Sequence, residues 1–181
     1  TKMQIKQSIN YSEMLEQSIL GIAILEPATA LKIVQLCHED WFYFDFHKEV
    51  FKAIKKRISE FKKVDMMLLP GDLIEKYNSV TYPPINGDRI SYLVAKLTEY
   101  VVSGAHISEW CSKIESLYHA RQIEGISSIS NSNLSSEEKK AKIEGILQFS
   151  KVVKNKTNWV QMGKAIDDYE KFYSDNVGKQ I

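Results

Sequence analysis

Two Gly-Lys pairs, at 163–164 and 178–179, come nearest to a nucleotide-binding motif in this sequence. A loop that wraps nucleotide phosphates needs an earlier Gly and a Ser or Thr directly after the Lys, because backbone amides hold the phosphates and the hydroxyl contacts magnesium. Neither pair has the earlier Gly, and Ala165 and Gln180 follow the two lysines. The sequence therefore predicts no phosphate-binding loop and no bound cofactor within these 181 residues.

Histidine, cysteine and carboxylate residues could supply a metal site or a nucleophile. The sequence contains no HExxH, CxxC or GxSxG motif, and the adjacent Asp167 and Asp168 are best explained by solvation. Cys111 lies in an apolar stripe with helical spacing, where a buried structural thiol is favoured over a nucleophile. The two cysteines are far apart, which suits a reducing compartment. We therefore predict no catalytic residue and no metal site among His38, His47, His106, His119, Cys37 and Cys111.

The stretch Asp40–Ile54, DWFYFDFHKEVFKAI, concentrates aromatic rings that could either stack on nucleobases or fill a core. Proteins that bind single strands combine such rings with a basic groove. Here Glu39, Asp40 and Asp45 lie within or beside the rings and would repel phosphate. We therefore predict that this block packs between helices as structural core. Its predicted core members are Trp41, Phe42, Tyr43, His47 and Phe51.

The charge balance argues against nucleic-acid binding as the main task of the chain. Lys and Arg number 24 against 23 Asp and Glu, whereas domains that grip phosphate backbones carry a clear basic excess. A nucleic-acid-binding face remains an alternative because one segment carries a local basic cluster, although a solvated helix face is the simpler interpretation. That cluster is Lys55, Lys56, Arg57, Lys62 and Lys63. The most apolar run, at 18–25, is too short to cross a bilayer, so we expect no membrane association.

Five predicted helices form a compact head at 11–100. Apolar residues recur in them at helical spacing, and no segment shows the alternation of a strand. The helices begin near residues that cap or open helices, which satisfy free backbone amides or tolerate the first turn. These residues are Ser12, Pro27, Asp45, Pro70 and Asp88.

Two longer helices joined by a polar turn follow the head. Apolar residues from Ile107 to Ile129 keep an i, i+3, i+4, i+7 pattern, and Ser135 with Glu138 predicts a capping box for the second helix. After a polar linker at 151–158 comes a last amphipathic helix. Each apolar stripe either folds back onto the head or covers a partner. The predicted organisation is all-α, with a flexible N-terminus at 1–10, a domain at 11–150 (head 11–100, antiparallel helical hairpin 104–150), and a linker at 151–181 that carries a detached helix at 158–174.

Several stretches occur in an order that resembles the N-terminal domain of the DnaB-type replicative DNA helicases. They read LEQSILGIAI (15–24), DWFYFDFHKEVFKAI (40–54), VDMMLLPGDL (64–73), ISYLVAKLTE (90–99) and SGAHISEWCSKIESLYHARQI (103–123), and TNWVQMGKAIDDYEKFY (157–173) is similar to the family's linker helix. The sequence departs from the family pattern at His106, where Ala or Ser is common, and at Trp110, where Tyr is usual. Positions that fit the family motifs include Glu16, Gly21, Phe42, Tyr43, His47, Ile107, Ile114 and Arg121.

The resemblance implies a non-catalytic collar domain. In that family the N-terminal domains pair through their hairpins and heads, three pairs form a collar on the hexameric ring, and primase docks on the collar. The linker helix packs against the motor domain of the neighbouring subunit. The implied hairpin and self-association residues are Ile107, Trp110, Ile114, Leu117, Tyr118, Arg121, Ile143, Ile146 and Leu147. The implied linker-helix contacts are Trp159, Met162, Ile166, Tyr169 and Tyr173.

The same resemblance places an ATPase domain after the linker helix. We therefore expect ATP, magnesium and DNA to bind a motor domain beyond Ile181, and we expect this chain alone to be no enzyme. Its expected partners are copies of itself (a dimer, or a hexamer built as a trimer of dimers), primase and a helicase loader, all in the cytoplasm. The alternative is a stand-alone helical adaptor of a primosome or helicase loader without a motor domain. A phosphate-binding loop in the downstream sequence would separate the two.

Overall fold

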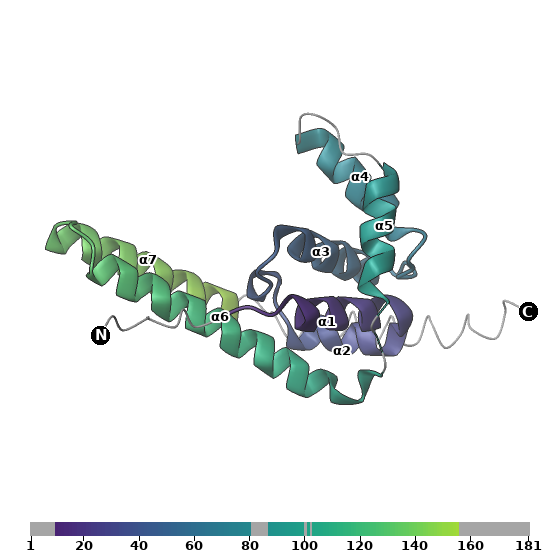
Figure 1. The fold of residues 1–181 in the computed structure, drawn as a ribbon, viewed down its shortest axis with the longest axis horizontal. Coiled ribbons are helices and arrows are strands. Elements are labelled where there is room, and N and C mark those ends of the chain that lie inside the picture. The colour runs from purple at the N-terminus through teal and green to yellow at the C-terminus, as the bar shows by residue number, and fades with distance from the viewer. Residues whose placement is uncertain (1–9, 81–86, 100, 102, 156–181) are drawn as a thin grey trace, which may run out of the picture.

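The computed structural model describes residues 10–80, 87–99, 101 and 103–155, with side chains at all of these except 77–80 and 149–155. Within them the chain is all-α, as predicted, and no strand occurs (Figure 1). No helix in this part of the chain combines the length and the apolar character that a membrane crossing requires. The elements in order are α1 (Glu13–Leu25), α2 (Pro27–Leu36), η1 (Glu39–Trp41), α3 (Asp45–Ser59), α4 (Leu69–Val80), α5 (Gly87–Leu97), η2 (Gly104–His106), α6 (Ile107–Ser130) and α7 (Ser136–Asn155).

Local signals set the starts of α1 and α2. Ser12 caps α1, and its Oγ accepts a hydrogen bond from the N–H of Leu15 at 3.3 Å. Pro27 opens α2, as the sequence predicted. Helix α3 differs, because Asp45 is its first residue, Phe44 is the cap, and the cap makes no side-chain hydrogen bond. The prediction that Asp45 caps α3 was therefore wrong by one position.

Helix α1 lies at the centre of the head. It contacts α2, α3, α5 and α6, and every residue from Ile19 to Ile24 is buried. Its approach to the end of α5 requires a glycine. A Cβ atom on Gly21 would overlap the carbonyl oxygen of Leu97 and lie 2.5 Å from a methyl carbon of Val101. The absence of a side chain at Gly21 thus allows the central helix to seat against α5.

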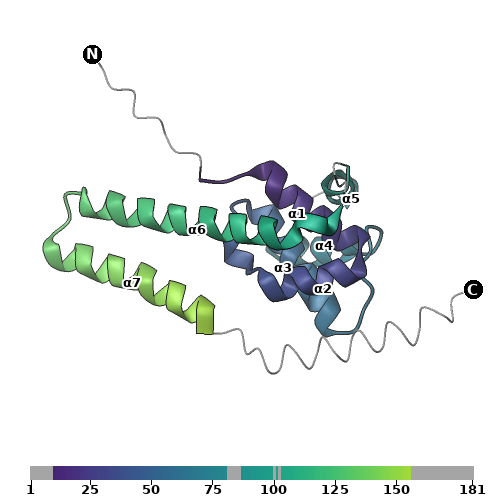
Figure 2. The same cartoon turned by 90° about the horizontal axis from the view of Figure 1, so that it is seen from below.

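Helix α6 begins inside the head and ends well outside it (Figures 1 and 2). Its buried residues all lie in its first half, where it contacts α1, α2 and η1. The second half leaves the head and pairs with α7 in an antiparallel hairpin. The first half of α6 is therefore part of the head, and the predicted division between a head at 11–100 and a hairpin at 104–150 does not follow the packing.

The turn between α6 and α7 has the capping box that the sequence predicted. The N–H of Ser135 donates to the carboxylate of Glu138 at 2.9 Å, and the N–H of Glu138 donates to Oγ of Ser135 at 3.3 Å. These hydrogen bonds lower the pKa of Glu138 below its usual value. Helix α7 continues to Asn155, so the first half of the predicted linker at 151–158 is helical.

Candidate interaction site at the hairpin and its joint with the head

The predicted hairpin residues in the first half of α6 belong to the core of the head. Ile107 and Ile114 are buried in the main hydrophobic cluster, and Trp110 is partly buried against it. Tyr118 is also buried. These four residues were predicted to form the seam of the hairpin or its pairing surface. The structure corrects that prediction, because the head covers them instead.

The distal hairpin, defined as residues 122–148, has a different character. It contains no buried side chain, and two of its large apolar side chains are exposed, Ile123 at 67% and Leu147 at 49%. The two helices approach each other closely at Gly125 of α6. There the Cδ1 atom of Ile146, on α7, lies 3.8 Å from the position that a Cβ atom on Gly125 would occupy. Ile143, like Ile146, is half-buried. Apolar surface therefore remains uncovered where the hairpin projects from the head.

Arg121 lies at the joint, where α6 leaves the head. We define the joint as Asn10, Trp41, Tyr43, Tyr118 and Arg121. The guanidinium of Arg121 donates to the carbonyl oxygens of Asn10, at 2.9 Å, and Trp41, at 2.7 Å. It also lies 5.6 Å from the centre of the Tyr43 ring and 5.8 Å from that of Tyr118. Arg121 was predicted as a self-association residue, and the structure instead gives its hydrogen bonds to carbonyl groups within the same chain.

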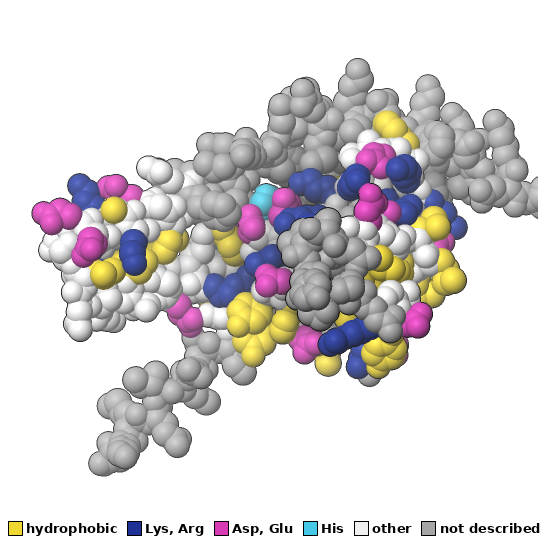
Figure 3. Space-filling view, turned by 90° about the horizontal axis from the view of Figure 1, so that it is seen from above, with side chains coloured by type: hydrophobic (Ala, Val, Ile, Leu, Met, Phe, Trp, Pro, Cys, Tyr) yellow, Lys and Arg dark blue, Asp and Glu magenta, His cyan; other side chains and the backbone are white. Residues whose placement is uncertain are grey.

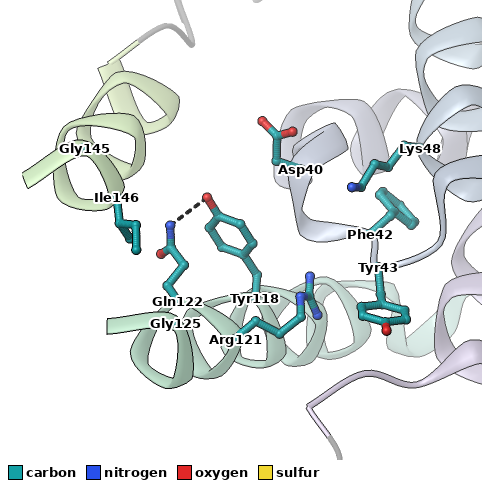
Figure 4. A pocket seen from close by; sticks show the side chains of 10 residues that line it. All are labelled: Asp40, Phe42, Tyr43, Lys48, Tyr118, Arg121, Gln122, Gly125, Gly145 and Ile146. Atoms are coloured by element: carbon teal, nitrogen blue, oxygen red, sulfur yellow. Dashed lines mark hydrogen bonds between the residues drawn. The ribbon is translucent and has the colours of Figure 1, made fainter. Parts of the chain in front are cut away.

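The environment of Arg121 is only partly polar. Burial lowers the pKa of its guanidinium below the usual value, and the negative charge of Glu16 partly offsets this effect. Figure 4 shows the Arg121 side chain reaching from α6 toward Tyr43 on the head. The side chain therefore connects the hairpin helix with the corner between η1 and α3.

Glu16 is a buried carboxylate that binds the backbone just before α3 begins. Its Oε1 accepts a hydrogen bond from the N–H of Tyr43 at 2.7 Å, and its Oε2 accepts from that of Phe44 at 3.4 Å. Oε2 also lies 2.7 Å from Nδ1 of His47, in the first turn of α3. Glu16 is 1% exposed and His47 is 5% exposed. A negative charge here is favourable because the helix N-terminus carries partial positive charge.

The aromatic block divides between core and surface. Phe42 and Phe51 have no exposed surface, and His47 is buried against Glu16. Trp41 is half-buried and packs on the core. Tyr43 is 45% exposed, so its prediction as a core residue was wrong. Its ring stacks on Tyr11 with centres 4.4 Å apart, which places it at the surface of the joint.

A groove of about 580 Å³ separates the head from the hairpin at this joint (Figure 4). Asp40, Phe42 and Lys48 line it on the head side, Ile146 lines it from α7, and Tyr118 lines it from α6 where that helix leaves the head. Burial, followed by the charge of Asp40, raises the pKa of Tyr118. The groove pairs no nucleophile with a base, and the described residues contain no cluster of three potential metal ligands.

The basic cluster that suggested nucleic-acid binding is neutralised by neighbouring carboxylates. Arg57 donates to both carboxylate oxygens of Asp72, at 2.5 and 3.0 Å, and to two backbone carbonyls. The four lysines of the cluster each lie within 4 Å of a carboxylate oxygen of Glu39, Glu60 or Asp65. Figure 3 shows basic and acidic side chains interspersed over the face of the molecule that it draws. This arrangement favours the solvated-face interpretation over a phosphate-binding surface.

Sequence reasoning missed the role of Glu16, although a signal was available. Glu16 is the one charged residue between Leu15 and Leu25, and it lies three and four positions before the buried Ile19 and Leu20 on the same side of the helix. A buried carboxylate requires partners, so its position indicated a polar contact without identifying it. The predicted linker contacts, Trp159, Met162, Ile166, Tyr169 and Tyr173, lie outside the described residues.

A family model and a solved structure both match this chain. The family model of the DnaB-like helicase N terminal domain matches residues 8–116, which span the head and the first turns of α6. The crystal structure of the N-terminal domain of DnaB helicase from Mycobacterium tuberculosis superposes with a TM-score of 0.62 at 15% identity, covering 77% of this chain and 97% of that chain. At this identity the superposition shows that the fold is shared. No curated protein sequence matches the chain.

Proposed function

Since the chain belongs to the DnaB-like helicase N-terminal domain family, we propose that it is the non-catalytic collar part of a replicative helicase and pairs subunits through its hairpin. One observation carries this proposal. The distal hairpin projects from the head with Ile123 and Leu147 exposed on its two helices (Figure 1). Exposed apolar side chains on a projecting element are typical of a surface that meets a partner.

The expected strength of pairing follows from the apolar area. Full burial of one Ile or Leu side chain contributes roughly 1.5–3 kcal/mol, and a symmetric pair of chains buries two copies of each. The loss of translational and rotational freedom offsets part of this gain. We therefore expect pairing to depend on protein concentration. One or two charged residues introduced into the exposed apolar surface should abolish it.

The finer assignments follow from the family and remain proposals. Three pairs would form a hexameric collar, and primase or a helicase loader would dock on it. A motor domain following the linker would bind ATP, magnesium and DNA in the cytoplasm. A G-x-x-x-x-G-K-[ST] motif in the sequence downstream of Ile181 would support the motor domain, and its absence from that sequence would favour the adaptor alternative.

The pairing proposal is tested by sedimentation velocity over a range of concentrations. The unmodified chain should form dimers or larger assemblies, and the double variant Ile123→Glu/Leu147→Glu should weaken association at least tenfold, an effect of about 1.4 kcal/mol or more. Met67→Glu is the matched control, because Met67 is an exposed apolar residue, at 80%, between α3 and α4 on the head. A chain that stays monomeric at high concentration, or a double variant that associates like the control, would contradict the proposal.

A further inference from the structure

Helix α6 is continuous from Ile107 to Ser130, yet it passes through two environments. Up to Tyr118 its inward side chains are buried in the head, and beyond Tyr118 none of its side chains is buried. The change takes place within one turn of helix, and Arg121 lies in that turn. The direction in which the hairpin leaves the head is therefore set at the joint.

The contacts of Arg121 connect three separate parts of the chain at this turn. The carbonyl of Asn10 belongs to the segment that enters α1, and the carbonyl of Trp41 belongs to the end of η1. Tyr43, whose ring lies beside the guanidinium, precedes α3. The side chain of Asn10 also donates to Glu124, one turn further along α6. The hairpin helix is thus tied to the head on the exposed side of the joint.

Arginine suits this task because its planar guanidinium can donate to two acceptors at once while its face lies on an aromatic ring. A lysine at the same position would carry the charge without that fixed fork. The two carbonyls that Arg121 joins are separated from it by 111 and 80 residues. Its hydrogen bonds therefore hold tertiary structure and do not stabilise α6 itself.

A small change in the angle at which α6 leaves the joint produces a larger displacement at the far end of the helix. The nine residues of α6 from Gln122 to Ser130 span roughly 13 Å, so a tilt of about 10° at the joint displaces the end of the helix by about 2 Å. Ile123 lies just beyond the joint and Leu147 lies on the paired helix. Both would change direction together if the joint loosened.

We propose that Arg121 is a positioning residue that fixes the angle between the hairpin and the head. The angle itself does not depend on the proposed function. The consequence for pairing rests on the proposed function, because a fixed angle presents the exposed apolar residues of two copies in one mutual orientation. Loss of the Arg121 contacts would leave the hairpin angle to be fixed during pairing, at a cost in entropy, without removing any apolar contact.

The test measures a distance within single chains. Spin labels on Asn133→Cys, in the turn between α6 and α7, and Lys56→Cys, on the exposed side of α3, report the position of the hairpin relative to the head. Native Cys37 and Cys111 are both buried, and labelling the chain without engineered cysteines checks that they take up no label. Dilution into excess unlabelled chain keeps the pulsed-dipolar signal intramolecular, whether or not the chains pair.

Arg121→Ala should at least double the width of the distance distribution, while circular dichroism shows the helical content unchanged. Arg121→Lys should also broaden the distribution, because it keeps the charge but lacks the rigid planar fork that fixes the geometry of the two hydrogen bonds. The Arg121→Lys variant decides the outcome if Arg121→Ala proves poorly folded. A width equal to that of the unmodified chain in a folded Arg121 variant would overturn the proposal, because packing around Tyr118 would then suffice to fix the angle.

Sedimentation of the same variants separates this proposal from the proposed function. If the chains pair, Arg121→Ala should raise the dissociation constant by about tenfold, since orientation is no longer fixed in advance. If the unmodified chain is monomeric but Arg121→Ala broadens the distances, pairing fails and the positioning role stands. If the chain pairs and the distances stay narrow in the variants, the positioning role fails and pairing stands.

Discussion

The buried contact between Glu16 and His47 shows how one side chain can connect two helices. Glu16 lies in the first turn of α1 and contacts the beginning of α3, where His47 is 31 residues away from it in the sequence. Its two oxygens accept from two backbone amides as well as contacting the imidazole. With all three partners placed, the cost of burying the carboxylate is offset by hydrogen bonds.

Removing this carboxylate should destabilise the head strongly. Glu16→Ala leaves two backbone amides and a buried imidazole without their acceptor, so we expect a loss of about 3 kcal/mol in the free energy of unfolding. Urea denaturation followed by circular dichroism measures it. Glu13→Ala on the same helix is the control, because Glu13 accepts an exposed hydrogen bond from Gln17 and its loss should cost less than about 1 kcal/mol. Equal losses in the two variants would show that Glu16 has no special role.

The two cysteines lie side by side in the core, although 74 positions separate Cys37 from Cys111 in the sequence. A side-chain hydrogen bond between Cys37 and Cys111, together with burial, raises the pKa of the Cys37 thiol well above its usual value. A thiol of raised pKa holds little thiolate at neutral pH and reacts slowly. The interpretation of Cys111 as a buried structural thiol agrees with its place in the hydrophobic core.

Among the helices, α1 shows why a glycine can be required inside a helix although it lowers helix stability. Glycine within a helix costs stability relative to alanine, because the unfolded chain loses more freedom on folding. At Gly21 this cost is accepted, since the carbonyl of Leu97 occupies the space of a side chain. At Gly71, in the first turn of α4, no described residue beyond its chain neighbours and its own helix backbone places a heavy atom within 4 Å of the Cβ position. The two glycines therefore predict opposite responses to the same substitution.

Gly21→Ala should destabilise the head by at least about 2 kcal/mol, because the backbone of α5 would have to move to admit the methyl group. Gly71→Ala should instead stabilise it by up to about 1 kcal/mol, since a helical Gly is replaced where space is open. Thermal unfolding of both variants beside the unmodified chain gives the comparison. Similar melting temperatures for the two variants would contradict the close approach of α1 to α5.

The molecule as a whole consists of a packed head and a hairpin that is only partly embedded in it. The largest fully buried side chains all come from the head and the first half of α6. Among the described side chains of α7, none is buried. Regions with few buried apolar contacts open locally at lower free energy than the core does, so stability should fall along α6 as it leaves the head.

Hydrogen exchange should reveal this gradient within one helix. In dilute solution, amides of α6 before Tyr118 should exchange at least about a hundredfold more slowly than those between Gln122 and Ser130, because the former open only with the head. Mass spectrometry of peptide fragments measures both halves. In concentrated solution the distal half should gain protection if chains pair there. Uniform exchange along α6 at low concentration would show that the hairpin is as stable as the head.

The sequence predicted local structure well, for a physical reason. The start of α2 at Pro27 and the capping box of α7 depend on groups within four residues of one another. The all-α fold and the family resemblance also rest on short patterns and their order, and the family match supports both. The placement of Phe42 and Phe51 in the core followed from hydrophobicity alone.

Only the tertiary structure decided what covers each apolar stripe and which partners meet the buried polar groups. Helical spacing shows that one face of α6 is apolar, but it does not say that the head covers Ile114 while Ile123 stays exposed. Likewise, the hydrogen-bond partners of Glu16 and Arg121 lie 27 to 111 residues away. Such contacts depend on how the helices cross in space, and periodicity within one helix carries no information about that crossing.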